Sequence, residues 1–168
     1  MRERSEIQGW FAGRVPAEWF AGPPEVLVDR DEIVVIGQLA EVTAAEGMDL
    51  NAARLGRIKA HREATREARM RIAREGQQKF GRAVSWAAQC GDVRELFTHL
   101  SLPVMTRLRI RERQVLDALV EAGVARSRSH ALAWCVRLVG QHQGDWVTEL
   151  REAVAQVEKV RGEGPKLN

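Results

Sequence analysis

The stretch Val104–Val139 reads VMTRLRIRERQVLDALVEAGVARSRSHALAWCVRLV, and it decides the predicted architecture. Its first residues alternate in character, which predicts a short β-strand that turns Met105, Arg107 and Arg109 toward one face. Two helices are expected to follow, separated by Gly123. A single strand leaves its backbone donors and acceptors unpaired, so we expect two copies to pair their strands into a two-stranded ribbon.

Local signals define both helices of this stretch. The first helix is predicted over about Glu112–Ala122, and Gly123 supplies the left-handed residue that ends it. Ser127 fits the N-cap of the second helix, whose free amides and positive dipole end would accept a DNA phosphate. We expect the phosphate contacts to come from Arg126, Ser127, Arg128 and Ser129. The apolar positions expected to form a dimer core are Leu108, Leu116, Leu119, Leu132, Cys135 and Leu138.

The succession LDALVEAG then ARSRSHAL, at Leu116–Gly123 and Ala125–Leu132, resembles the ribbon-helix-helix family of the Arc and methionine repressors. The resemblance covers about residues 103–140. It implies a homodimer whose ribbon enters the major groove of DNA and reads base edges with its outward side chains. On this resemblance Met105, Arg107 and Arg109 would contact bases. The alternative is an ordinary helical hairpin behind a connecting strand, with solvated arginines.

Composition is that of a soluble, foldable chain. Its 168 residues are 45% hydrophobic and 29% charged, which suffices for one or two small domains. No apolar run approaches a membrane span, and the N-terminus lacks the apolar core of a signal peptide, so we expect a cytoplasmic protein. Cys90 and Cys135 offer neither a disulfide framework nor a metal site. We expect no cofactor.

Charge is distributed unevenly along the chain. Residues 1–53 carry 4 basic and 10 acidic side chains, whereas residues 54–82 carry 10 basic and 3 acidic ones. A long basic helix is predicted over 51–82, because this segment is rich in helix formers and lacks proline. A helical repeat places four cations within about 80° of one another, namely Lys59, Arg62, Arg66 and Arg69. This face predicts contact with a nucleic-acid backbone; the alternative is a solvated helix that bridges two domains.

The remaining segments complete an α+β, mainly helical fold. Residues 1–50 predict a small α+β unit, in which Val26–Val28 and Glu32–Ile36 form a β-hairpin and the repeated WFAG motif (Trp10–Gly13 and Trp19–Gly22) packs in the core. A connecting helix is expected within 83–102, around Val93–Leu100. An amphipathic helix is expected over 143–161, followed by a disordered tail at 162–168.

These features favour a dimeric, sequence-specific DNA-binding protein, most simply a transcriptional regulator. One alternative is an RNA- or ribosome-associated protein that uses the basic helix and the aromatic residues. Another is an antitoxin-like or scaffold protein that holds a protein partner through its N-terminal unit or C-terminal helix. No phosphate-cradling glycine loop, nucleophile elbow or metal-binding helix motif occurs, so we do not expect an enzyme.

Overall fold

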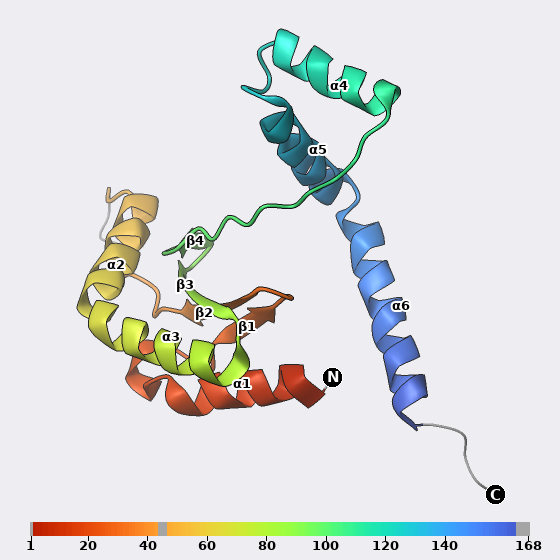
Figure 1. Cartoon of the computed structure of the whole chain (residues 1–168). Coiled ribbons are helices and arrows are strands. Elements are labelled where there is room, and N and C mark those ends of the chain that lie inside the picture. Colours follow the sequence, from red (N-terminus) through yellow and green to blue (C-terminus); the bar gives the residue numbers. More distant parts are fainter. Residues whose placement is uncertain (1, 44–46, 164–168) are drawn as a thin grey trace, which may run out of the picture. The chain divides into compact units, whose positions relative to one another are not determined.

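The computed structural model describes residues 2–43 and 47–163 (Figure 1). The chain divides into two compact units, Arg2–Leu102 and a second unit that begins at Pro103. The predicted α+β, mainly helical class is confirmed. The segments predicted as 1–50, 51–82 and 83–102 therefore fold together as one unit, and the predicted boundary near 102 separates the two units.

The N-terminal unit combines helices with a four-stranded sheet in the order β1-β2-β3-β4. The outer pairs β1–β2 and β3–β4 are antiparallel, and the central pair β2–β3 is parallel. A parallel pair needs a crossover, which α2 and α3 provide. The elements are α1 (Arg2–Arg14), a short 3-10 turn η1 (Ala17–Trp19), β1 (Glu25–Val28), β2 (Glu32–Gln38), α2 (Leu50–Ala64), α3 (Arg66–Phe80), β3 (Ala83–Cys90) and β4 (Val93–Leu96).

The predicted β-hairpin is confirmed as β1 and β2. Its turn is held by Asp29, whose Oδ1 accepts hydrogen bonds from the backbone N–H groups of Asp31 at 2.8 Å and Glu32 at 2.7 Å. A side chain that bonds the backbone two residues on is a common turn device, which explains why the local sequence indicated the hairpin.

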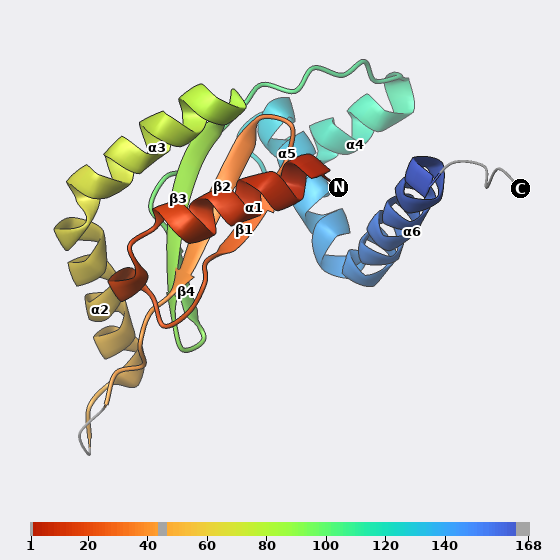
Figure 2. The same cartoon turned by 90° about the horizontal axis from the view of Figure 1, so that it is seen from below.

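The core lies between the sheet and α1 and α3, which cover the same face (Figures 1 and 2). Phe11 of the first WFAG motif is fully buried there. Trp10 and both aromatics of the second motif are partly buried against it. The predicted core role of the two motifs is therefore confirmed. The buried members of this cluster are Ile7, Phe11, Val15, Val26, Ile33, Val35, Ile72 and Trp86.

The helix expected within 83–102 is wrong, because β3 and β4 occupy this segment. Strand β3 has consecutive buried residues, Ser85 to Ala88, so both of its faces are covered. A strand buried on both faces shows no alternation of apolar and polar residues. Phe97 does pack as expected, and its N–H donates to the carbonyl of Trp86 at 2.8 Å.

The single basic helix expected over 51–82 is also wrong, since Thr65 separates α2 from α3. Thr65 has φ −100° and ψ 2°, outside the helical values of its neighbours. Its hydroxyl donates to the carbonyl of His61 at 2.6 Å. Back-bonding of this kind bends helices.

The second unit contains α4 (Ile110–Glu121), α5 (Arg128–His142) and α6 (Gly144–Glu163), at the positions the sequence predicted. Leu116, Ala125 and Ala131 form its small buried core between α4 and α5. Helix α6 follows α5 after a break at Gln143 and extends away from the α4–α5 hairpin (Figure 1).

The strand expected near Val104–Arg109 is extended chain without helix or ladder pairing. One copy offers this segment no partner strand, so the ribbon stays a prediction. At the other end of the unit, the expected disordered tail is wrong for Gly162 and Glu163, which continue α6. Residues 164–168 lie outside the described residues.

Candidate nucleic-acid interface

The corner between α4 and α5 has the predicted helix-terminus geometry. Gly123 takes φ +74°, the left-handed value that ends α4. Ser127 caps α5, and its hydroxyl accepts from the N–H of His130 at 3.2 Å. The four residues proposed for phosphate contact, Arg126, Ser127, Arg128 and Ser129, are all exposed. The corner therefore presents the positive end of a helix to solvent, where an anion is favoured.

Arg128 is not a free cation at this corner. It forms a two-point ion pair with Asp117 of α4, with Nε–Oδ1 at 2.6 Å and Nη2–Oδ2 at 2.7 Å. The hydrogen bonds and charge of Arg128 lower the pKa of Asp117 and keep it ionised. The pair therefore links α4 to α5 and neutralises Arg128. Among the described residues, no ion pair engages Arg126, which leaves it as the available charge.

The extended segment before α4 presents the residues expected to reach bases. Met105 is 98% exposed, and Arg107 and Arg109 are exposed as well. Leu108, expected in the dimer core, packs against the α4–α5 core, whereas Val104 at the start of the segment is 86% exposed. A groove of about 310 Å³ runs between this segment and α4–α5.

The residues expected in a dimer core surround one small cluster. Leu116 is buried, and Leu108, Leu119, Leu132 and Cys135 pack against it with part of their surface exposed. Leu138 is half-buried outside this cluster. A core of this size leaves apolar surface uncovered in a single copy. The large apolar residues exposed on this unit include Val104, Ile110, Val115, Val136 and Val139.

The structure separates the four cations of the predicted basic face. Lys59, Arg62 and Arg66 are exposed, whereas Arg69 is buried. The interpretation of Arg69 as part of an exposed face is therefore wrong. A single helical repeat does not hold across Thr65, where the chain bends.

Arg69 lies under the bend between α2 and α3. Its Nε donates to the hydroxyl of Thr65 at 2.9 Å, and its Nη2 donates to the carbonyl of Arg62 at 2.6 Å. Its guanidinium carbon stands 4.6 Å from the ring centroid of Phe97, and that of Arg62 stands 5.6 Å from the same ring. Burial, then the charges of Arg62 and Arg66, lower the pKa of Arg69 to about 10.

Among the described residues, five other cations of this unit are engaged in ion pairs. Arg14 at the end of α1 holds Glu75 of α3 through two hydrogen bonds of 2.7 and 2.8 Å. Arg54 holds Glu41 and Asp92 together. Further pairs are Lys79–Glu6, Arg82–Glu3 and Arg94–Glu25. Within residues 54–82 the cations that form these pairs, Arg54, Lys79 and Arg82, lie near the two ends of the segment. The cations beside the bend form no ion pair among the described residues.

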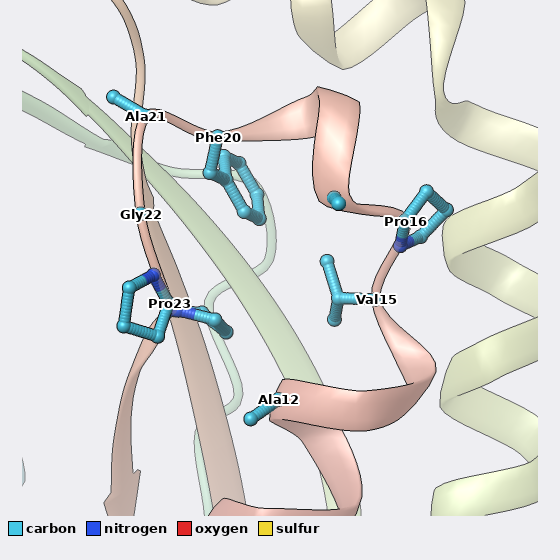
Figure 3. Close-up of a pocket in the computed structure, with 9 residues that line it drawn as sticks. Ala12, Val15, Pro16, Phe20, Ala21, Gly22 and Pro23 are labelled. Atoms are coloured by element: carbon cyan, nitrogen blue, oxygen red, sulfur yellow. The ribbon is translucent and has the colours of Figure 1, made fainter.

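Figure 3 shows a pocket of about 320 Å³ between the end of α1 and the segment leading to β1. Its lining side chains carry no acid, base or nucleophile, which gives it no evident catalytic chemistry. The lining residues are Ala12, Val15, Pro16, Ala17, Phe20, Ala21, Gly22, Pro23 and Pro24. Within the described ranges, no three His, Cys, Asp or Glu side chains gather as metal ligands. No described helix has the length and apolar character needed to cross a bilayer.

Comparison with known proteins covers nearly the whole chain. A family model described as "Rv1265-like protein, N-terminal domain" matches residues 5–96, and one described as "Mb1296 C-terminal domain" matches residues 109–161. The chain belongs to the Rv1265-like family. Each matched range falls within one of the two structural units.

Relatives in this family extend beyond the matched region. "Uncharacterized protein Rv1265" of Mycobacterium tuberculosis is 54% identical over 159 residues, which cover 94% of this chain and 70% of the relative. "Uncharacterized protein Mb1296" of Mycobacterium bovis matches with the same identity and coverage. No solved structure matches the chain.

Proposed function

We propose that the chain acts in the cytoplasm as a homodimeric, sequence-specific DNA-binding protein, most simply a transcriptional regulator. The observation that carries the proposal is the unpaired segment Val104–Arg109, which leads into two helices joined by Gly123 and the Ser127 cap. Pairing this segment with its copy would satisfy its backbone and cover the exposed Val104.

In the proposed complex the paired segments enter the major groove, and Met105, Arg107 and Arg109 contact base edges. Arginine suits this role because its planar guanidinium can hold two acceptors of guanine. The N-terminus of α5 would bind a phosphate of the backbone through its free amides and Arg126.

The basic surface at the α2–α3 bend would add contacts that do not depend on sequence. Lys59, Arg62 and Arg66 are exposed there, and no ion pair engages them among the described residues. Each phosphate neutralised by such a side chain releases counterions, so the contribution falls as salt rises.

Light scattering and DNA selection test the proposal together. Scattering at micromolar concentration should give about twice the 18.9 kDa chain mass, and selection from random duplexes should enrich a defined sequence. Arg107→Ala should weaken the selected site by about 1–3 kcal/mol and relax its base preference. The matched control is Arg111→Ala, which removes the same charge from exposed α4. A monomer contradicts the proposal, and so does an equal loss of affinity for every DNA sequence in both variants. Binding of structured RNA in place of duplex DNA supports the RNA alternative.

A second candidate function, binding of a protein partner, draws on α6. This helix carries an apolar face that is about half exposed along its length, with Trp146 at 55%, Val154 at 57% and Val157 at 57%. Contiguous apolar surface of this kind marks interaction sites. Two results together would favour this function. The chain would bind no nucleic acid at low salt, and the wild type would retain a host protein that the Val154→Glu variant does not retain.

A further inference from the structure

The bend between α2 and α3 buries the positive charge of Arg69. Arg69 is only 6% exposed, and its hydrogen-bond partners, the Thr65 hydroxyl and the Arg62 carbonyl, are uncharged. No ion pair involving Arg69 occurs within the described ranges. A buried charge without a counterion costs several kcal/mol, so proteins usually pair it or neutralise it.

Arg69 stands in a cluster of groups of the same sign. Both Arg62 and Arg66 act on it electrostatically, and both are exposed on the solvent side of the bend. Phe97 lies against the guanidinium groups of Arg62 and Arg69. The guanidinium groups of Arg62 and Arg69 therefore lie at the same ring, and the charge of Arg66 also acts on Arg69, with no carboxylate among the groups that shift the pKa of Arg69.

His61 completes the surroundings of this cluster. Its ring packs against Trp19, Phe20 and Phe97, at centroid distances of 5.9, 5.2 and 6.5 Å. Its Nε2 is buried without a hydrogen-bond partner among the described residues. Burial, and then the charge of Arg69, lower the pKa of His61, so an anion bound beside Arg69 would raise this pKa.

We propose that the α2–α3 bend is a binding site for a phosphate group, held by Arg62 and Arg66 above the buried Arg69. Phosphate fits because its several oxygens accept from more than one guanidinium group, whose planar donors match them in pairs. The inference deepens the proposed function, in which Arg62 and Arg66 already contact phosphates, but it does not depend on duplex DNA, because the site would also bind free phosphate.

The same phosphate chemistry can come from a free ion or from a nucleic-acid backbone. Both would place a compact anion beside the guanidinium groups, and a backbone phosphate would also bring an adjacent base toward the ring of Phe97. Separate titrations with inorganic phosphate and with a short single-stranded oligonucleotide distinguish the two sources.

The test is an NMR titration of the full chain with inorganic phosphate at constant ionic strength, monitored at the His61 ring. Binding should raise the pKa of His61, because the bound anion offsets the charge of Arg69. Arg66→Gln should weaken phosphate binding about tenfold, as expected for loss of one charge-assisted contact. The matched control is Arg71→Gln, which removes an equal charge from another exposed position of α3 and should leave the affinity unchanged.

Two outcomes overturn the proposal. One is the absence of any phosphate-dependent change at His61 in the folded wild type. The other is equal weakening by Arg66→Gln and Arg71→Gln, which would mean that net charge alone attracts the ion. Because Arg66 is exposed, its replacement leaves the buried contacts of Arg69 in place, and a matched amide spectrum of the variant verifies the fold. Neither arm requires dimerisation or duplex DNA, so failure here is distinguishable from failure of the proposed function.

Discussion

The ring of Phe20 lies directly against the backbone of Gly37. A β-carbon at position 37 would overlap three ring atoms of Phe20. Next to this contact, the N–H of Ala21 donates to the carbonyl of Gln38 at 2.8 Å. The second WFAG motif therefore contacts β2 through the ring of Phe20 and through one backbone hydrogen bond. The ring can occupy this place because Gly37 has no side chain.

Gly37→Ala should destabilise the N-terminal unit by about 1–3 kcal/mol, because the added methyl must displace the ring of Phe20 from a packed site. Urea denaturation measures the loss. Gly22→Ala is the matched control, since a β-carbon there meets nothing within 4 Å. Equal stability of the two variants would show that Phe20 moves aside freely.

Leu132→Glu should abolish the proposed dimer and unfold the second unit, because a charge would enter the apolar cluster around Leu116. Light scattering and circular dichroism report the two effects. Ala133→Glu places the same charge on the exposed opposite face of α5 and should leave both unchanged. A folded monomer of the Leu132 variant would separate the helical hairpin from dimerisation and argue against the ribbon.

Lys59→Ala should weaken binding to every DNA sequence alike and reduce the salt dependence by about one phosphate. The reason is that Lys59 is exposed and no ion pair engages it within the described residues. Lys79→Ala is the control, since Lys79 pairs with Glu6 at 3.1 Å and its charge is balanced. Binding measured from low to moderate salt gives both slopes, and identical slopes for the two variants would remove α2 from the interface.

Stability of the N-terminal unit should rise with pH across the range just below 6.5. His61 has a folded pKa below its ordinary value of 6.5, chiefly through burial. Below pH 6.5 the unfolded chain binds a proton at His61 that the folded state excludes. The contribution of neutral His61 to the free energy of unfolding is therefore full above pH 6.5, and it decreases as the pH falls from 6.5 to the folded pKa. Urea denaturation at several pH values between about 5 and 8, the range in which histidine titrates, measures how the free energy of unfolding depends on pH.

His61→Gln should remove this pH-dependent contribution. His99→Gln, at an exposed position of the same unit, should retain it. A slope that persists in the His61 variant would assign the proton uptake to another group.

Elements that depend on neighbouring residues could be predicted from the sequence. The hairpin turn at Asp29, the helix stop at Gly123 and the cap at Ser127 each act within a few residues. The pairing of β3 with β2 could not be predicted in this way, because it joins residues far apart and leaves no alternation in β3.

The candidate sites divide along the same line. The exposure of Arg107 and Lys59 agrees with their predicted faces. The burial of Arg69 depends on the bend at Thr65 and on Phe97, which arrives from the far end of β4. The ion pair between Arg128 and Asp117 could not be predicted from local sequence either, because the two residues lie on different helices.

The parallel pairing of β2 with β3 also sets an order of events during folding. Glu32 pairs with Ala83, so the centre of the sheet closes a loop of about fifty residues, whereas the β1–β2 hairpin and the α4–α5 corner close short ones. The chain loses entropy when a long loop closes, before the contacts that stabilise the closed loop have formed, and folding is slower for this reason. On the ribosome the hairpin would be complete while β3 is still unsynthesised, and the inner edge of β2 stays open until residue 90 has emerged.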